Sequence, residues 1–313
     1  MTSSPSGTDS LFARLLKLVT SQKHREKPVH AFLFFSAFVS VLTTFGIVWV
    51  LVKESLPFFA KVSVFDYLLG TQWNPLFRPQ SFGVLPLVCG TFLIAFGAAL
   101  VAIPFGVGTA IFLSEYASDR LRNFVKPVLE ILSGIPTVVY GYFALTFITP
   151  ILQKIFPSTE VFNALSGSIV VGIMALPMVA SLSDDAMRSV PNALRYASYA
   201  LGSTKFETSF RIVFPAALSG IVASFVLAIS RAIGETMAVT LASGATPKLT
   251  LNPLESIQTM TAYIVQVSLG DTPQGTIEYQ TIFVIGLTLF FITLMMNILS
   301  NRVLAKYKMR YET

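Results

Sequence analysis

Long apolar runs constrain this chain more than any other feature of its sequence. Six runs approach or exceed the length of about 20 residues that a helix needs to cross the hydrocarbon core of a membrane; they cover residues 29–52, 82–113, 127–152, 164–182, 216–243 and 281–300. The chain is 53% hydrophobic and only 12% charged, which is typical of an integral membrane protein rather than a soluble globule. We therefore predict an all-α integral membrane fold with six spans, in which residues 29–305 form the transmembrane domain.

Glycine and proline interrupt two of these runs. The second run contains Pro86, so we expect a kink there or a helix that begins after it. The third run is broken by Gly134, Pro136 and Gly141. These three residues admit two interpretations, because they can loosen a helix that must move or allow two helices to pack closely.

The positive charges predict the orientation of the spans. Sixteen of the 22 lysines and arginines lie in segments on one side, at residues 14–27, 120–126, 188–211 and 302–310, and five lie on the other side. Since positively charged loops remain in the cytoplasm, both termini are predicted to be cytoplasmic. The predicted tails are residues 1–28 and 306–313.

The remaining composition argues against several classes of partner. A net charge of +6 is distributed over short segments between spans, so we expect contact with membrane lipid and none with nucleic acid. The single cysteine, Cys89, cannot form a disulfide within the chain, and no cysteine cluster predicts a metal site.

The fifth run contains two ionisable residues, Arg231 and Glu235. Each costs roughly 2.5–3.5 kcal/mol at the centre of a membrane helix on insertion scales, so both are functional candidates. Their spacing of four predicts that they share one helix face, where they can pair. Either Arg231 binds a passing oxyanion while Glu235 holds its geometry, or the pair neutralises itself and fixes helix packing.

A segment of about 183–215 is long for a connection between two membrane helices and is a candidate functional loop. Its part YASYALGSTKFETSFRIVFP, residues 196–215, resembles the cytoplasmic coupling motif of bacterial ABC-importer permeases. The resemblance is carried by the spacing of Ala197, Gly202, Ile212 and Pro215. Tyr196, Ser198 and Phe214 depart from the motif, which has Glu, Ala and Leu at these places.

A short helix that ends at a glycine turn suits docking into a groove of a partner ATPase. We expect this contact to involve Ala197, Leu201, Gly202, Ile212 and Pro215.

Four further stretches narrow the resemblance. They are SRAIGETMAVT at 230–240, SGIPTVVYGY at 133–142, FGVLPLVCGT at 82–91 and IPFGVGTAIFLSEYA at 103–117. Together they are similar to the phosphate-specific ABC-importer permeases, and more narrowly to the PstC type of subunit.

The resemblance implies a six-span type I importer fold in the bacterial inner membrane and phosphate as the substrate. It also implies three partners: a second, PstA-like permease subunit, a PstB-like ATPase dimer and an extracellular, PstS-like phosphate-binding protein. The chain has no G-x-x-x-x-G-K-[ST] phosphate loop, so we expect no cofactor in it, no enzymatic activity of its own, and ATP and Mg in the partner ATPase.

Other functions remain to be weighed. Molybdate or sulfate permeases are the nearest alternatives, since an arginine suits any tetrahedral oxyanion. A secondary transporter would need its own coupling-ion site, and only Glu235 lies deep in a span, beside Arg231. An intramembrane protease would need a Ser and His dyad, two Asp in spans or a metal cluster; both histidines lie at or before the first span.

Overall fold

The computed structural model describes residues 7–308 of the chain, and the side chains of residues 29–300 and Arg302. Residues 1–6 and 309–313 of the two predicted tails lie outside the described residues. Helices make up nearly all of the regular structure, with one pair of two-residue strands. The predicted helical class is confirmed.

The first helix, α1 (Gly7–Phe59), belongs to two compact units. Residues up to Lys53 form one unit by themselves, and residues 54–313 form the other. Within α1 the stretch Val29–Phe59 is 31 residues long and apolar enough to cross a membrane. The first predicted span therefore extends beyond residue 52.

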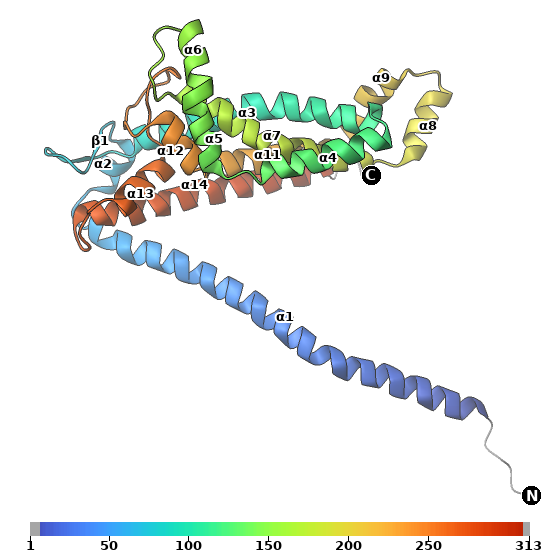
Figure 1. The fold of residues 1–313 in the computed structure, drawn as a ribbon. Helices are drawn as coiled ribbons and strands as arrows, with labels where there is room; N and C mark the ends of the chain where they lie inside the picture. The colour runs from blue at the N-terminus through green and yellow to red at the C-terminus, as the bar shows by residue number, and fades with distance from the viewer. Residues whose placement is uncertain (1–6, 309–313) are drawn as a thin grey trace, which may run out of the picture. The chain divides into compact units, whose positions relative to one another are not determined.

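The unit of residues 54–313 is built on four helices that pack along one another: α3 (Leu85–Ile111), α7 (Ala164–Arg188), α11 (Leu218–Ile233) and α14 (Ile277–Lys308) (Figure 1). Small residues let α3 and α7 approach closely. A Cβ atom at Gly97, Gly106 or Gly172 would collide with a side chain of the opposite helix. The buried core between them is correspondingly rich in alanine, including Ala95, Ala98 and Ala175.

Different elements cover the two ends of this bundle (Figure 1). At one end, which we call the α8 end, lie α8 (Asn192–Ala200) and α9 (Lys205–Thr208), followed by the π-helical turn η3 (Ser209–Val213) and α10 (Phe214–Ala216). At the other, which we call the α13 end, lie α2 (Val64–Leu69), α13 (Met260–Leu269) and the strand β1 (Trp73–Asn74), which pairs with β2 (Ser81–Phe82). Trp73 is buried there against Tyr263, with ring centroids 5.0 Å apart.

The second predicted span has different bounds from those expected. Its helix begins at Leu85, so Pro86 lies in its first turn, where a missing N–H is tolerated. Pro104 lies inside the helix, and the span Leu85–Tyr116 ends in the π-helical turn η1 (Phe112–Tyr116). The fourth and sixth spans, Ala164–Arg188 and Ile277–Ser300, include the predicted residues.

The third predicted span, residues 127–152, is wrong in its first part. These residues belong to α4 (Asp119–Ser133), a separate helix with one charged and one apolar face. Pro136 has no N–H and restricts Ile135 before it, so the chain breaks at Gly134–Pro136. The span itself is Thr137–Ile155, formed by α5 (Thr137–Phe143), η2 (Ala144–Ile148) and α6 (Thr149–Ile155).

The fifth predicted span, residues 216–243, is not one continuous helix. Helix α11 ends at Ile233, residues 234–236 are non-helical, and α12 (Met237–Ser243) follows. Gly234 has a low helix propensity, which favours an end to α11 at this point. Within residues 7–308, five helices are long and apolar enough to cross a membrane, or six if the pair Lys205–Ala216 and Leu218–Ile233, bent by 70°, is one span.

Candidate functional site: the Arg231 cavity and the connection to α8

Arg231 lies in the last turn of α11 and lines a cavity of about 380 Å³. The other lining residues come from α4 and α7: Leu129, Glu130, Ser133, Pro177, Met178, Ser181 and Leu182. The side chain of Arg231 is half-buried. Among residues 29–300 it has neither an ion pair nor a hydrogen bond. The cavity therefore contains a permanent positive charge that has no ion-pair partner among the described side chains.

Glu235 does not share a helix face with Arg231, because the chain leaves the helix between them. Its Oε1 atom accepts a hydrogen bond of 3.2 Å from the N–H of Ala238, at the start of α12. Its carbonyl oxygen accepts one of 2.7 Å from the hydroxyl of Thr261, next to the start of α13. Glu235 is only 8% exposed, and within the described residues it forms no ion pair with Arg231.

A cluster of ion pairs joins Arg122 and Lys126 of α4 to Asp184 and Asp185 of α7, between the cavity and the α8 end. Arg122 donates from Nη2 and Nε to Oδ2 of Asp184, at 2.8 and 3.1 Å, and Lys126 contacts Asp185 at 2.5 Å. The Asp184 side chain is 0% exposed, and its Oδ1 atom has no hydrogen-bond partner in the described part of the chain. This cluster was not among the predicted site residues, although the spacing of Arg122, Lys126 and Glu130 by four marks one face of an amphipathic helix.

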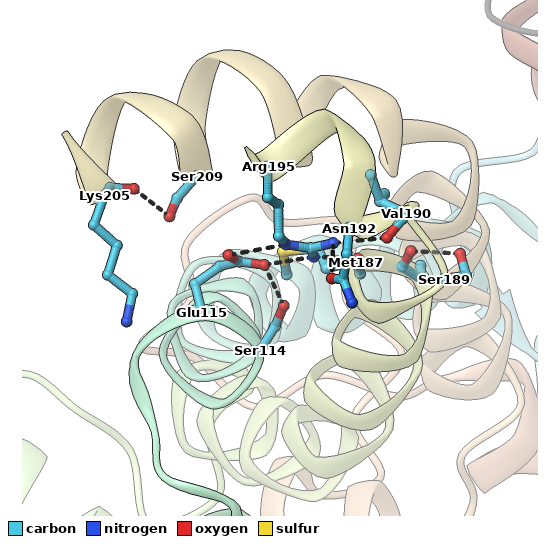
Figure 2. Close-up of polar contacts among 10 residues, drawn as sticks. Ser114, Glu115, Met187, Ser189, Val190, Asn192, Arg195, Lys205 and Ser209 are labelled. Carbon is cyan, nitrogen blue, oxygen red and sulfur yellow. Dashed lines mark hydrogen bonds and ion pairs between the residues drawn. The ribbon is translucent and has the colours of Figure 1, made fainter. Parts of the chain in front are cut away.

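A separate ion pair connects the second span to α8 (Figure 2). Arg195 of α8 donates from Nη2 to Oε1 of Glu115 at 2.8 Å and from Nε to Oε2 at 3.4 Å. The same guanidinium donates to the carbonyl oxygens of Met187, at 2.9 Å, and Val190, at 2.6 Å. Ser114 donates to Glu115 from the other side at 2.8 Å. Sequence analysis did not single out this pair.

The predicted coupling residues lie around the turn that follows α8. Gly202 has φ = +84°, a left-handed conformation that glycine adopts without strain, and its N–H donates to the carbonyl of Tyr199 at 3.0 Å. Leu201 is 87% exposed, and Ala197 is exposed on α8. Ile212 lies in η3 and Pro215 in α10, both half-buried. The five residues are therefore divided between α8 with its following turn, η3 and α10, and they differ in exposure.

Ser198, which departs from the motif, connects the two short helices of this segment. Its hydroxyl shares a hydrogen bond of 2.9 Å with that of Thr208 in α9, and both side chains are buried. Tyr196, the other departure on α8, is exposed and has the place of the acidic residue of the motif.

Gly134, Pro136 and Gly141 were predicted to control helix motion or packing, and they lie in two kinds of place. Gly134 ends α4 and Pro136 precedes α5, so both belong to a break between helices. Gly141 lies within α5, against α12; a Cβ atom there would be 2.9 Å from Cβ of Leu241 and 3.1 Å from Cα of Ala238. Because α5 and α12 pack closely at this point, position 141 has no room for a side chain.

Solved structures with the same fold are transport proteins of the ABC class. The chain aligns with a bacterial alginate ABC transporter in complex with a periplasmic protein, at a TM-score of 0.62, with 16% identity over 90% of this chain and 95% of that one. The MetNI methionine ABC transporter, in an inward-facing conformation, aligns at a TM-score of 0.52, with 17% identity over 72% of this chain and 94% of that one. The predicted type I importer permease fold is confirmed.

Curated relatives are permeases. The probable ABC transporter permease protein YqgH of Bacillus subtilis is 37% identical over 77% of this chain and 79% of its own length. The phosphate transport system permease protein PstC of Mesorhizobium japonicum is 30% identical over 79% of this chain and 80% of its own length. The corresponding protein PstC 1 of Mycobacterium tuberculosis is 33% identical over 74% of this chain and 79% of its own length. Residues 102–307 match the family model for the binding-protein-dependent transport system inner membrane component. The chain therefore belongs to this family of ABC-importer permeases, and within it is similar to PstC.

Proposed function

We propose that this chain is one permease subunit of an ATP-driven importer of inorganic phosphate in the bacterial inner membrane. This chain forms one half of the translocation pore, and a second permease subunit forms the other half. The observation that carries the proposal is the unpaired guanidinium of Arg231 on the wall of a cavity of about 380 Å³.

The chemistry of Arg231 suits a tetrahedral oxyanion. A guanidinium presents planar donors that match two oxygens of phosphate, and it stays charged at any working pH. An arginine with an ion-pair partner would have to lose that partner before it could bind substrate. Because Glu235 is engaged at the start of α12, Arg231 needs no such exchange. The similarity to PstC supports phosphate as the oxyanion.

The partners follow from the two ends of the bundle. The segment around Gly202 at the α8 end docks onto a separate ATPase dimer, which binds ATP and Mg. Exposed Tyr196, Leu201 and Phe206 supply apolar contact area for that docking. The α13 end receives phosphate from an extracellular binding protein. In this arrangement the α8 end is cytoplasmic, as are both termini.

Uptake by the assembled importer tests the proposal. The chain is reconstituted with the second permease, the ATPase and the binding protein of the same source, and uptake of labelled phosphate, sulfate and molybdate is normalised to assembled complex. Phosphate should be taken up with ATP. Arg231→Gln should assemble but lose about 100-fold in uptake, the effect of removing a charged hydrogen bond of roughly 3 kcal/mol. Arg302→Gln, an exposed arginine of α14, is the matched control. Normal uptake by Arg231→Gln would refute the proposed substrate path.

Thiol labelling tests the orientation. In a Cys89→Ala background, Ser63→Cys should react with an impermeant thiol reagent in intact cells. Ser203→Cys, beside the α8 turn, should react only after permeabilisation. Labelling of position 203 in intact cells would place the α8 end outside and remove the basis for ATPase docking.

A further inference from the structure

The Arg231 cavity has a second charged residue on its wall, Glu130 of α4, and the proposed function gives it no role. Its side chain is exposed, and within residues 29–300 its carboxylate has neither an ion pair nor a hydrogen bond. The hydroxyl of Ser133 donates to the backbone carbonyl of Glu130 at 2.7 Å, so the carboxylate itself stays available. A carboxylate and a guanidinium, neither of them in an ion pair, thus line one cavity.

Both charged groups are unpaired because their neighbours along the chain are engaged elsewhere. Lys126, four residues before Glu130 on α4, is at the spacing of a helical ion pair, yet it contacts Asp185 of α7 at 2.5 Å. Glu235, four residues after Arg231, bonds the N–H of Ala238. The structure therefore leaves a donor set and an acceptor free together on the walls of the same cavity.

A carboxylate beside an anion-binding arginine discriminates between oxyanions by their hydrogens. Phosphate and arsenate carry at least one O–H near neutral pH, which a carboxylate accepts in a charge-assisted hydrogen bond. Sulfate and molybdate carry none, so each would bring an oxygen against the carboxylate with no hydrogen between them. A site built to bond a substrate O–H rejects the analogue that lacks it strongly, because the site's polar group is left unpaired.

The volume of the cavity is sufficient for this arrangement, and two hydroxyls lie on its wall. At about 30 Å³ per water, a volume of about 380 Å³ holds a five-atom oxyanion together with part of its hydration shell. The half-buried hydroxyls of Ser133 and Ser181 lie on the same wall and are able to donate or accept as the bound ion requires.

We infer that Glu130 accepts the O–H of an oxyanion held by Arg231, so that this cavity selects hydrogen-bearing tetrahedral oxyanions over those without hydrogen. The inference rests on the proposed function and adds to it a selectivity that belongs to the permease itself. It is independent of any selectivity of the binding protein that delivers the ion.

The test therefore omits the binding protein. The complex of this chain with its second permease and ATPase is purified, and bound labelled phosphate is displaced by arsenate, by sulfate and by monofluorophosphate, in which fluorine replaces the hydroxyl. At a mildly alkaline pH phosphate and these last two competitors are all dianions, and only phosphate carries a hydrogen. Arsenate should displace phosphate well, and the other two poorly.

In Glu130→Gln the preference for phosphate over sulfate and over monofluorophosphate should fall by about tenfold to 100-fold, the value of one charged hydrogen bond. The amide of Gln both donates and accepts, so it serves either class of ion. Glu130→Ala, which has no acceptor at all, should also lose the preference. Asp271→Asn is the matched control, since Asp271 is exposed, has no ion pair or hydrogen bond among the described residues, and lies outside the cavity lining.

The outcomes separate the two proposals. If phosphate binds and Arg231→Gln abolishes its binding, but the preference in Glu130→Gln stays within twofold of the unmodified complex, the selectivity role of Glu130 is refuted while the phosphate path stands. If the unmodified complex binds no phosphate, or if Arg231→Gln binds it normally, both proposals fail. Equal affinity of the unmodified complex for phosphate and monofluorophosphate also refutes the role of Glu130.

Discussion

Glu115 and Arg195 lie 80 residues apart in the sequence, and their side chains are 2.8 Å apart between Oε1 and Nη2. Because Arg195 also bonds the carbonyls of Met187 and Val190, one guanidinium holds together the end of the second span, the end of α7 and the start of α8. The exposed fractions of the two side chains are 4% for Glu115 and 12% for Arg195. A displacement of α8 by a docked partner would therefore reach two spans through this one residue.

Substitution of Arg195 should destabilise the protein more than substitution of Glu115. Arg195→Gln leaves the buried Glu115 carboxylate without its countercharge and should lower the free energy of unfolding by roughly 3–5 kcal/mol. Glu115→Gln leaves Arg195 bonded to two carbonyls and should cost about 1–3 kcal/mol. Thermal unfolding of the purified protein measures both, with the exposed Arg188→Gln expected within about 0.5 kcal/mol of the unmodified protein. Equal losses for the two variants would mean that the carbonyl contacts contribute nothing.

Gly202 and Gly108 offer a matched test of backbone conformation. A Cβ atom added at either glycine meets no atom within 4 Å, but Gly202 has φ = +84° whereas Gly108 is helical within α3. Gly202→Ala should cost about 1–2 kcal/mol through left-handed strain, and Gly108→Ala should gain up to about 1 kcal/mol. We expect less ATPase to co-purify with Gly202→Ala, and phosphate uptake to fall with it. If both alanine variants behave alike, the turn after α8 does not need glycine.

Gly141 and Gly134 differ in the space around them. At Gly141 a methyl group would push α5 away from α12, and such overpacking costs roughly 1–3 kcal/mol. At Gly134 the nearest atom to an added Cβ is a backbone oxygen at 3.4 Å, so alanine should change stability by no more than about 0.5 kcal/mol. Thermal unfolding of Gly141→Ala and Gly134→Ala distinguishes packing from conformational freedom. A stable Gly141→Ala protein would show that the two helices are able to separate.

Arg231 and Glu235 should behave as independent sites in a double-mutant cycle. Glu235→Gln weakens the bond to the N–H of Ala238 and should cost about 0.5–1.5 kcal/mol, the value of one hydrogen bond. Arg231→Gln should add its own effect, with a coupling energy below about 0.5 kcal/mol. The prediction is falsified if the double mutant regains stability by 1 kcal/mol or more relative to the sum of the single changes.

Hydropathy alone predicted the spans that are simple helices. The apolar runs that became α3 and α7 are long and continuous, so their length is decisive, and their many small residues are consistent with the close contact between them. The resemblance in the segment after Asp184 placed Gly202 at a turn, and its positive φ agrees with that placement.

Hydropathy failed where a run changes structure without changing polarity. The run of residues 216–243 is apolar on both sides of Gly234–Thr236, so a window average cannot detect the break. The local signal was the succession of Gly234, a poor helix residue, and Glu235, whose side chain accepts a hydrogen bond from the first turn of the next helix. For α4 the apolar half of the helix merged with the following span, although Ser118 at its N-cap and its regularly spaced charges indicate a separate amphipathic helix. The pairing of Asp184 with Arg122 depends on tertiary contacts that no local pattern contains.

The break between α11 and α12 has an electrostatic consequence for the two charges beside it. The carbonyl groups at the C-terminal end of a helix carry partial negative charge and the N–H groups at the N-terminal end carry partial positive charge. Arg231 lies in the last turn of α11, and the carboxylate of Glu235 bonds the first turn of α12, so each charge is matched to the favourable end of a different helix dipole. Such a placement stabilises a charge by about 0.3–1 kcal/mol, and by up to about 2 kcal/mol when it is partly buried. The chain can thereby keep a positive and a negative group among membrane helices without joining them to each other.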